Sequence, residues 1–249
     1  MRKTILVVFL LIISMIYIFS EEKQVFKTVV VLFDLSGSTN KPEIRQKYSE
    51  AFGTILSRMS HGDALVAALI TEKSVFEPSL PIKEEFPKFM PKTDNPLYKA
   101  AEERKAQEEL QKKKDDLKTL ADAVLKDQTR KIMKTDIMSS LQVAEKIFKS
   151  FSHPKKVLVI MSDMIEDSED YNFEKENLSE KRIEEIITRE RNKERIPDLG
   201  GTKVYVVGAN SKNLNQYYRV QNFWLRYFKG CGAILLKETY GSVLINFNE

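Results

Sequence analysis

The sequence has little cysteine and little histidine. Its 249 residues contain one cysteine and two histidines, and the single thiol, Cys231, cannot form a disulfide within the chain. We expect Cys231 to be a small buried core residue rather than a reactive thiol, because a free cysteine packs as a small hydrophobe. His61 and His153 lie in segments typical of loops, with no acid or nucleophile pattern beside them. We therefore assign neither histidine to catalysis.

An excess of charge of one sign is also missing. Forty Lys and Arg residues face 36 Asp and Glu residues, for a formal net charge of +4 that includes Arg2 and Lys3. This balance gives no indication of a nucleic-acid partner. The chain is 42% hydrophobic, which is ample for the core of one large α/β domain.

The first twenty residues differ in composition from the rest. Residues 4–19 form an almost unbroken apolar run after two basic residues, which is the pattern of a targeting segment. A helix of this length rises about 24 Å, short of the roughly 30 Å hydrocarbon core of a membrane. The length favours a signal peptide that is cleaved off. Ser20 is a small residue that could precede the cut, but Ile18, two positions earlier, is not small, which argues against cleavage. Residues 1–20 are thus predicted to be a signal peptide or an N-terminal membrane anchor.

Either form of this segment places the remaining chain outside the cytoplasm. The basic residues precede the apolar run and Glu21 and Glu22 follow it, which is the charge order of the positive-inside rule. We expect an exported protein, periplasmic or extracellular, that is either secreted or anchored through residues 4–19.

Strand and helix patterns alternate along much of the chain. Residues 28–33 are an apolar, β-branched run, typical of a strand buried on both faces of a sheet. Further strands are predicted at 64–70, 157–161, 203–207 and about 233–236, with helices at 42–59, 136–151, about 178–193 and 214–228. This alternation predicts a Rossmann-like, doubly wound α/β fold with a mainly parallel sheet covered on both faces.

The segment after residue 70 interrupts that alternation. A turn at 72–74 predicts an antiparallel strand at about 75–80, and four prolines between Pro81 and Pro96 are expected to exclude regular structure there.

Residues 98–131 are rich in charged residues, alanine and leucine, and therefore predict one long helix. We expect a solvated arm or a lid near the ligand-binding edge, with a partner-binding coiled coil as the alternative. A domain at 25–245 would thus carry a helical insertion at about 88–133.

Polar side chains are predicted where two buried strands end. Asp34, Ser36 and Ser38 follow the first strand at alternate positions. Thr135 begins the helix that precedes the 157–161 strand, and Asp163 follows that strand. Ligands of an open parallel sheet bind outside the carboxyl ends of its strands. We therefore expect these side chains to meet at one edge of the sheet.

The chemistry of this group suits a hard cation. Two carboxylates and three hydroxyls are oxygen ligands, which favour Mg²⁺, Mn²⁺ or Ca²⁺ over zinc or copper. Each residue also has a simpler interpretation. Ser38 and Thr135 could cap the helices that follow them, and Asp163 could be an ordinary turn residue.

The Asp-x-Ser-x-Ser loop at Asp34, with the later Thr135 and Asp163, resembles the metal-ion-dependent adhesion site of von Willebrand factor A (VWA) and integrin inserted domains. The segment 221–233 is similar to the close of bacterial members of that family. The resemblance covers about residues 25–240, interrupted by about forty residues around the long helix.

The resemblance implies a six-stranded sheet with one antiparallel edge strand. It also implies that the hydroxyls of Ser36, Ser38 and Thr135 contact the ion, while Asp34 and Asp163 act largely through bound water. An Asp or Glu side chain of a protein partner would complete the coordination. Where family members often have glycine before the threonine, this chain has Lys134, whose ammonium could lower the affinity for the cation.

Three functions are compatible with these residues. The first is a non-enzymatic, extracytoplasmic module for adhesion, assembly or scaffolding that binds its partner through the cation. The second is a Mg²⁺-dependent phosphohydrolase, because Asp34 with Asp163 and Asp167 also resembles haloacid dehalogenase-like enzymes. That chemistry usually needs a second Asp two residues after the nucleophile, where this chain has Ser36. The third is a metal-free scaffold of the same fold.

An acidic stretch follows the last site residue. Glu166, Asp167, Glu169 and Asp170 are predicted to form a solvated loop, with a second cation site or a dock for a basic partner as alternatives. A separate aromatic cluster is predicted to be the buried and half-buried stripe of one helix: Tyr217, Tyr218, Phe223, Trp224, Tyr227 and Phe228.

Overall fold

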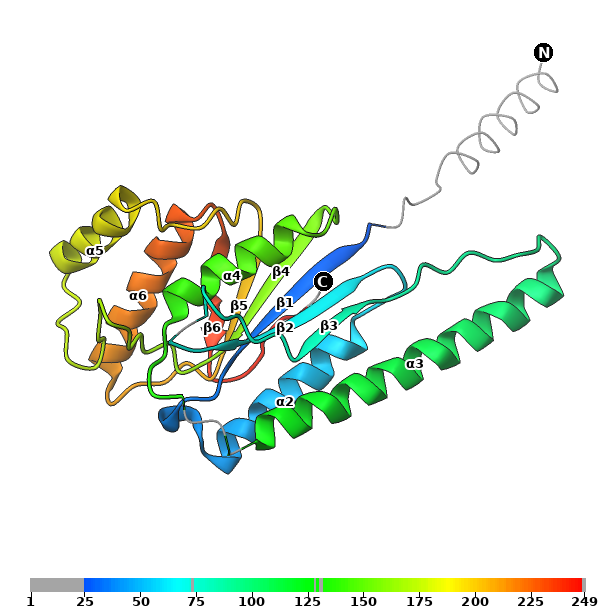
Figure 1. Ribbon diagram of the computed structural model, residues 1–249, viewed down its shortest axis with the longest axis horizontal. Coiled ribbons are helices and arrows are strands. Elements are labelled where there is room, and N and C mark those ends of the chain that lie inside the picture. The colour runs from blue at the N-terminus through cyan, green and yellow to red at the C-terminus, as the bar shows by residue number, and fades with distance from the viewer. Residues whose placement is uncertain (1–24, 73, 128, 130–131, 248–249) are drawn as a thin grey trace, which may run out of the picture.

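The computed structural model describes residues 25–72, 74–127, 129 and 132–247 (Figure 1). The predicted signal peptide or anchor at 1–20 lies outside these residues, so it stays a prediction. Within the described ranges, no helix is both long enough and apolar enough to cross a membrane.

Six strands form a single sheet in the order β3-β2-β1-β4-β5-β6. Their bounds are Lys27–Asp34 (β1), Ala64–Ile70 (β2), Ile82–Glu85 (β3), Lys155–Met161 (β4), Lys203–Val207 (β5) and Ile234–Gly241 (β6). Only β3 pairs antiparallel, at one edge, and the other pairs are parallel. The prediction of a mainly parallel, six-stranded sheet with one antiparallel edge strand is confirmed.

Helices cover both faces of this sheet (Figure 1). They are α2 (Pro42–Ser57), α3 (Pro96–Lys126), α4 (Ile137–Lys149), α5 (Glu180–Asn192) and α6 (Leu214–Gly230), with a short 3₁₀ helix η1 (Gly37–Thr39). Alternate side chains of β1 divide between two cores. Val30 and Leu32 pack with α4, α5 and α6, whereas Val29, Val31 and Phe33 pack with α2 and α3. The sheet is therefore buried on both sides, as its apolar strands predict.

The edge strand is not where the sequence pattern predicts it. Residues 75–80 form no strand, and β3 lies instead at Ile82–Glu85, pairing with Ala64–Ala67 of β2. The prediction that regular structure is absent between Pro81 and Pro96 is also wrong. Proline has no N–H for a strand ladder. Pro78 lies within the predicted strand, whereas β3 fits between Pro81 and Pro87 and needs neither of them in its ladder.

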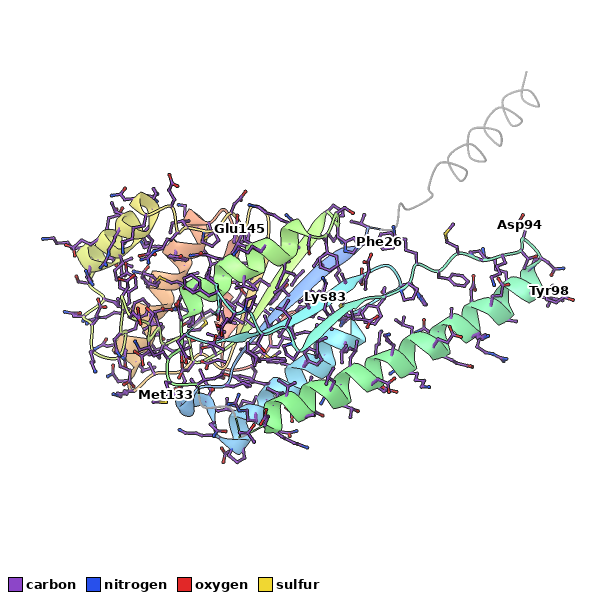
Figure 2. The ribbon with its side chains drawn as sticks, viewed as in Figure 1. Phe26, Lys83, Asp94, Tyr98, Met133 and Glu145 are labelled. Carbon is purple, nitrogen blue, oxygen red and sulfur yellow. The ribbon has the colours of Figure 1, made fainter. Side chains whose placement is uncertain are left out.

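Helix α3 forms a projecting arm, which agrees with the prediction of a solvated arm. It begins two residues before the predicted helix, at Pro96, where Asn95 caps it by accepting a hydrogen bond from the N–H of Leu97 (3.1 Å). Its second half packs in the core through Leu110, Leu117, Ala121 and Leu125. Its first half extends away from the sheet, with Asp94 and Tyr98 at the far end (Figure 2).

The arm extends from the end of the sheet at which β1 begins. Lys88, in the segment that leads into the arm, lies 4.9 Å from the ring centroid of Phe26, the residue that precedes β1. Figure 2 shows Phe26 at the same end of the molecule as the arm. The arm therefore does not cover the opposite end of the sheet, where β1 ends. The prediction of a lid near the ligand-binding edge is wrong.

Two predictions about the core hold with one exception. Cys231 is buried, as expected of a small core residue. Within α6, Phe223, Trp224, Tyr227 and Phe228 are fully buried. Tyr218 belongs to the exposed face, because 60% of its surface is accessible.

Candidate metal centre

The Asp34 carboxylate is enclosed at the carboxyl end of β1. It has no exposed surface, and both of its oxygens accept hydrogen bonds. The N–H of Ser36 donates to Oδ1 (2.9 Å), and the hydroxyl of Ser162 donates to Oδ2 (2.7 Å). Burial raises the pKa of Asp34 above its usual value, although the bonds from Ser36 and Ser162 and the charge of Arg45 act in the opposite direction.

The main chain of the loop after Asp34 is held from two sides. The Thr39 hydroxyl donates to the carbonyl oxygens of Asp34 (2.8 Å) and Ser36 (3.1 Å). From α2, Nη1 of Arg45 donates to the same Asp34 carbonyl oxygen at 2.8 Å. Both side chains bind carbonyl groups, so they fix the path of the loop without occupying its carboxylate.

Ser36 and Ser38 bring their hydroxyls together. Their Oγ atoms are 3.2 Å apart, with Ser36 buried and Ser38 exposed. The capping interpretation of Ser38 is wrong, because α2 begins after Lys41, where no side-chain cap is formed. The Ser38 hydroxyl therefore does not cap α2.

Asp163 completes a group of four at this edge. Its Oδ1 accepts the N–H of Ile165 at 3.0 Å, so the turn interpretation describes it too. Burial and then the nearby charge of Asp34 raise the pKa of Asp163 to about 6, while the Ile165 N–H and the Ser38 hydroxyl act in the opposite direction. The structure therefore brings Asp34, Ser36, Ser38 and Asp163 together, with two acidic groups that disfavour each other's charge.

Thr135 is less closely tied to this group. Its main-chain N–H and C=O exchange hydrogen bonds with those of Asp167, at 2.9 and 3.0 Å. It does not cap α4, because that role belongs to Asp136, whose side chain accepts the N–H of Ser139 at 2.9 Å. Among the described residues, no hydrogen bond joins Thr135 to the Asp34 loop. Its role as a fifth ligand stays a prediction.

The acidic stretch after Asp163 is not simply solvated, which corrects the prediction for its first member. Glu166 is completely buried, and its Oε2 accepts the main-chain N–H groups of Ile137 (3.0 Å) and Met138 (3.2 Å) at the start of α4. The first N–H groups of a helix lack partners within it, which explains why an acceptor side chain lies there. Asp170 pairs with Arg195 at 2.7 Å.

Lys134 lies beside this acidic stretch. It lines a pocket of about 190 Å³ together with Asp136, Glu166 and Glu169. Lys134 thus lines a different pocket from the one that Ser38 and Asp163 line.

Sequence reasoning missed four residues that shape the site. Ser162 and Arg45 hold Asp34, as described above. The third, Tyr48 of α2, is completely buried, and its hydroxyl has no hydrogen-bond partner among the described residues. The fourth, Gly208, follows β5 with φ of +98°, and a Cβ atom there would lie 2.7 Å from the Tyr48 hydroxyl oxygen. The signal for Gly208 was available, since a glycine directly after a buried strand marks a special backbone position.

The site opens to the outside through a shallow pocket. Ser38 and Asp163 line a pocket of about 260 Å³, and the same pocket is lined by Lys41, Lys212 and Glu174. The Lys212 ammonium and the Glu174 carboxylate are 3.3 Å apart. An incoming group can therefore reach Ser38 and Asp163 past two basic side chains, whereas Asp34 and Ser36 are buried and do not line this pocket.

The donor set fits a hard divalent cation. All four grouped side chains offer oxygen, the preferred ligand of Mg²⁺, Mn²⁺ and Ca²⁺. Among the described residues, no three His, Cys, Asp or Glu side chains are placed to hold a metal ion. A cation at this edge would therefore depend on the serine hydroxyls and on water in addition to the two carboxylates.

The comparisons with known proteins concern the fold. No protein-family model matches the chain, and no curated protein matches its sequence. Proximal thread matrix protein 1 from the mussel byssus is 14% identical with a TM-score of 0.42, over 78% of this chain and 39% of that one. A von Willebrand factor type A protein from Catenulispora acidiphila is 10% identical with a TM-score of 0.36, over 84% and 43%.

The VWA domain of SpRpn10 is 8% identical with a TM-score of 0.35, over 79% of this chain and 82% of that one. The byssus protein has also been solved with a zinc-occupied MIDAS motif. This chain spans less than half the length of the byssus and Catenulispora proteins. At these identities and TM-scores, none of these proteins indicates what this chain binds.

Proposed function

We propose that this chain is a non-enzymatic binding module of the VWA type. In this proposal the Asp34 loop and Asp163 hold a divalent cation, Mg²⁺ or else Mn²⁺ or Ca²⁺, which in turn holds an Asp or Glu side chain of a protein partner. The observation that carries the proposal is the meeting of two buried carboxyl groups with the hydroxyls of Ser36 and Ser38 at one edge of the sheet.

Electrostatics support the choice of a cation. The pKa of Asp163 rises to about 6 because the group is buried and lies near Asp34. A divalent ion that neutralises two buried, mutually repelling carboxylates lowers their free energy. Arg45 balances part of this charge, but its contact is with the Asp34 carbonyl oxygen and leaves the carboxylate oxygens to Ser36 and Ser162.

The partner would approach through the pocket that Ser38 and Asp163 line. Lys41 and Lys212 on this pocket suit a partner surface that carries an acidic side chain. When bound, the cation supplies a Lewis-acidic centre for that carboxylate. Ser38 would meet it from the exposed side, while Asp34 stays beneath, oriented by Ser162.

Hydrolysis is disfavoured by the same loop. A phosphohydrolase of the haloacid dehalogenase type usually needs an acid two residues after its nucleophile. Ser36 occupies that position, and its hydroxyl faces Ser38 at 3.2 Å. The site has ligands for a cation, yet at this position it offers no group to protonate a leaving group.

The alternative is a metal-free scaffold, and Arg45 is the observation that favours it. The guanidinium charge of Arg45 opposes the rise that burial causes in the pKa of Asp34, and this partial compensation reduces the need for a bound cation. This alternative and the proposal make opposite predictions for titration with Mg²⁺ or Mn²⁺.

Calorimetric titration of the full-length chain with Mg²⁺ and with Mn²⁺ tests the proposal. We expect saturable binding by the wild type, loss of binding in Asp34→Ala, and at least about tenfold weaker binding in Ser38→Ala. Ser38 is exposed, so we expect Ser38→Ala to change the free energy of unfolding by less than about 0.5 kcal/mol. A loss of binding in this variant therefore cannot be attributed to a folding defect, as it could be in Asp34→Ala. Glu43→Ala, which removes an exposed carboxylate of α2, is the matched control. Absence of binding by the wild type would favour the metal-free scaffold.

The partner and the location belong to the same proposal. We infer an extracytoplasmic protein that is secreted or anchored through residues 4–19. Capture of a partner from the host envelope should require Mg²⁺ or Mn²⁺ and should fail both with a chelator and with Asp34→Ala. The mass of the mature N-terminus, measured on protein purified from that envelope, distinguishes a cleaved signal peptide from a retained anchor.

A further inference from the structure

Tyr48 has a hydroxyl that the fold encloses without satisfying it. The side chain has no exposed surface, and no described residue accepts or donates a hydrogen bond at its oxygen. Burying a polar group without a partner costs free energy. A phenylalanine would fill the space of the ring without that cost, so the hydroxyl itself calls for an explanation.

The hydroxyl lies where the site's strands end. A Cβ atom on Gly208 would be 2.7 Å from the Tyr48 oxygen and 3.1 Å from the carbonyl oxygen of Ser162. Ser162 is the residue that holds Asp34 and that precedes Asp163 in the chain. The absence of a side chain at Gly208 therefore leaves the space in which the Tyr48 hydroxyl approaches the site.

The hydroxyl is available as a hydrogen-bond donor in this setting. Burial, followed by the charges of Asp34 and Asp163, raises the pKa of Tyr48 well above its usual value. The group therefore keeps its proton. The two acids that act on it, Asp34 and Asp163, belong to the proposed metal centre. A donor enclosed beside two acids fits an acceptor that arrives with a ligand, such as water held by a cation.

We propose that Tyr48 is a positioning residue of the cation site, whose hydroxyl donates a hydrogen bond to the oxygen shell that Asp34 and Asp163 hold around the cation. This inference rests on the proposed function. It adds a residue from α2 that lies outside the Asp-x-Ser-x-Ser loop and that no sequence motif marks. Cation binding would then satisfy a polar group that is unsatisfied in the cation-free fold.

The test compares Tyr48→Phe with the wild type in the full-length chain. Outer partners of a metal site typically contribute 10- to 100-fold to affinity, so we expect Mg²⁺ and Mn²⁺ to bind about tenfold more weakly by calorimetry. In the presence of a chelator, the melting temperature of Tyr48→Phe should equal or exceed that of the wild type, because an unsatisfied hydroxyl has been removed. The upward shift of the melting temperature on adding Mg²⁺ should be smaller in the variant.

Tyr227→Phe is the matched control. Tyr227 is also completely buried, and its hydroxyl also lacks a partner, but it packs in the core on the opposite face of the sheet from Tyr48. Removing this hydroxyl should leave the affinity for Mg²⁺ and Mn²⁺ at the wild-type value.

The outcomes separate this inference from the proposed function. Wild-type affinity in Tyr48→Phe, together with loss of binding in Asp34→Ala, would overturn the role of Tyr48 and leave the metal centre standing. Equal weakening by Tyr48→Phe and Tyr227→Phe would also overturn it, since the effect would then reflect packing in general. No binding by the wild type would overturn both.

Discussion

The hydroxyl of Ser162 donates a 2.7 Å hydrogen bond to Oδ2 of Asp34, across 128 residues of sequence. The same hydroxyl accepts the main-chain N–H of Met164 at 3.0 Å. One small side chain thus ties the end of β4 to the end of β1, and it orients the carboxylate around which the site is built.

Removing this link should destabilise the protein. We expect Ser162→Ala to lower the free energy of unfolding by about 2 kcal/mol, because a buried carboxylate loses a hydrogen bond and a buried N–H loses its acceptor. Urea denaturation of both proteins measures the difference. Ser57→Ala, at an exposed serine on α2, should change the free energy by less than about 0.5 kcal/mol. Similar values for the two variants would contradict the assigned role of Ser162.

A side chain at Gly208 should be poorly tolerated. Gly208 has a φ of +98°, and a Cβ there would overlap Tyr48 at 2.7 Å. We expect Gly208→Ala to lower the free energy of unfolding by at least about 2 kcal/mol, from backbone strain and overpacking together. Gly37→Ala serves as the control, because a Cβ at Gly37 meets no atom within 4 Å. Thermal unfolding of the two variants should separate them clearly.

Stability should depend on pH through Glu166. Burial, and then the charge of Asp136, raises the pKa of Glu166 well above the usual 4.5, although the N–H groups of Ile137 and Met138 act in the opposite direction. The folded protein therefore holds this proton at pH values where the unfolded chain has released it. This contribution to stability is present at low pH and is lost as the pH rises above 4.5 towards the folded pKa.

Glu166→Gln isolates that effect. Glutamine keeps an acceptor for the two N–H groups at the start of α4 but does not titrate. Urea midpoints measured between about pH 4 and about pH 8 should fall more steeply with pH in the wild type than in the variant. Parallel curves would show that Glu166 does not titrate differently in the two states.

The two halves of α3 should differ in their contribution to stability. Leu117 lies in the half that packs in the core, and Leu97 lies at the start of the arm, where 83% of its surface is exposed. We expect Leu117→Ala to lower the free energy of unfolding by about 2 kcal/mol or more, because a buried side chain leaves a cavity. Leu97→Ala should lower it by less than about 0.5 kcal/mol. Urea denaturation of the two variants measures this difference, and equal losses would contradict it.

Much of the fold could be predicted because apolar runs map directly onto buried strands. The predicted strands at 64–70 and 203–207 match β2 and β5 residue for residue. The edge strand β3 could not be placed in the same way. Its sequence, Ile-Lys-Glu-Glu, has only one buried side chain, so it carries no apolar period. Its position as the edge strand is defined by its pairing with β2.

The site was predictable only where topology alone decides. Asp34 ends β1 and Asp163 follows β4, which pairs with β1 in parallel, and their proximity results from that arrangement. The positions of Arg45 and Tyr48 depend on which face of α2 turns towards the loop and on how closely the helix packs. Glu166 was misjudged for a related reason, since a run of acidic residues is usually solvated and only the start of α4 beside it supplies partners for a buried carboxylate.

Strand β1 has a further consequence for how the molecule bears force. It lies between β2 and β4, pairing in parallel with both, and its eight residues extend for about 25 Å. The preceding chain joins one end of this strand, and the candidate metal centre follows the other. A pull between a preceding tether and a partner bound at that centre would therefore act along β1. Its hydrogen bonds to both neighbours would then be sheared together rather than opened one after another, so the pull would act on both ladders at once.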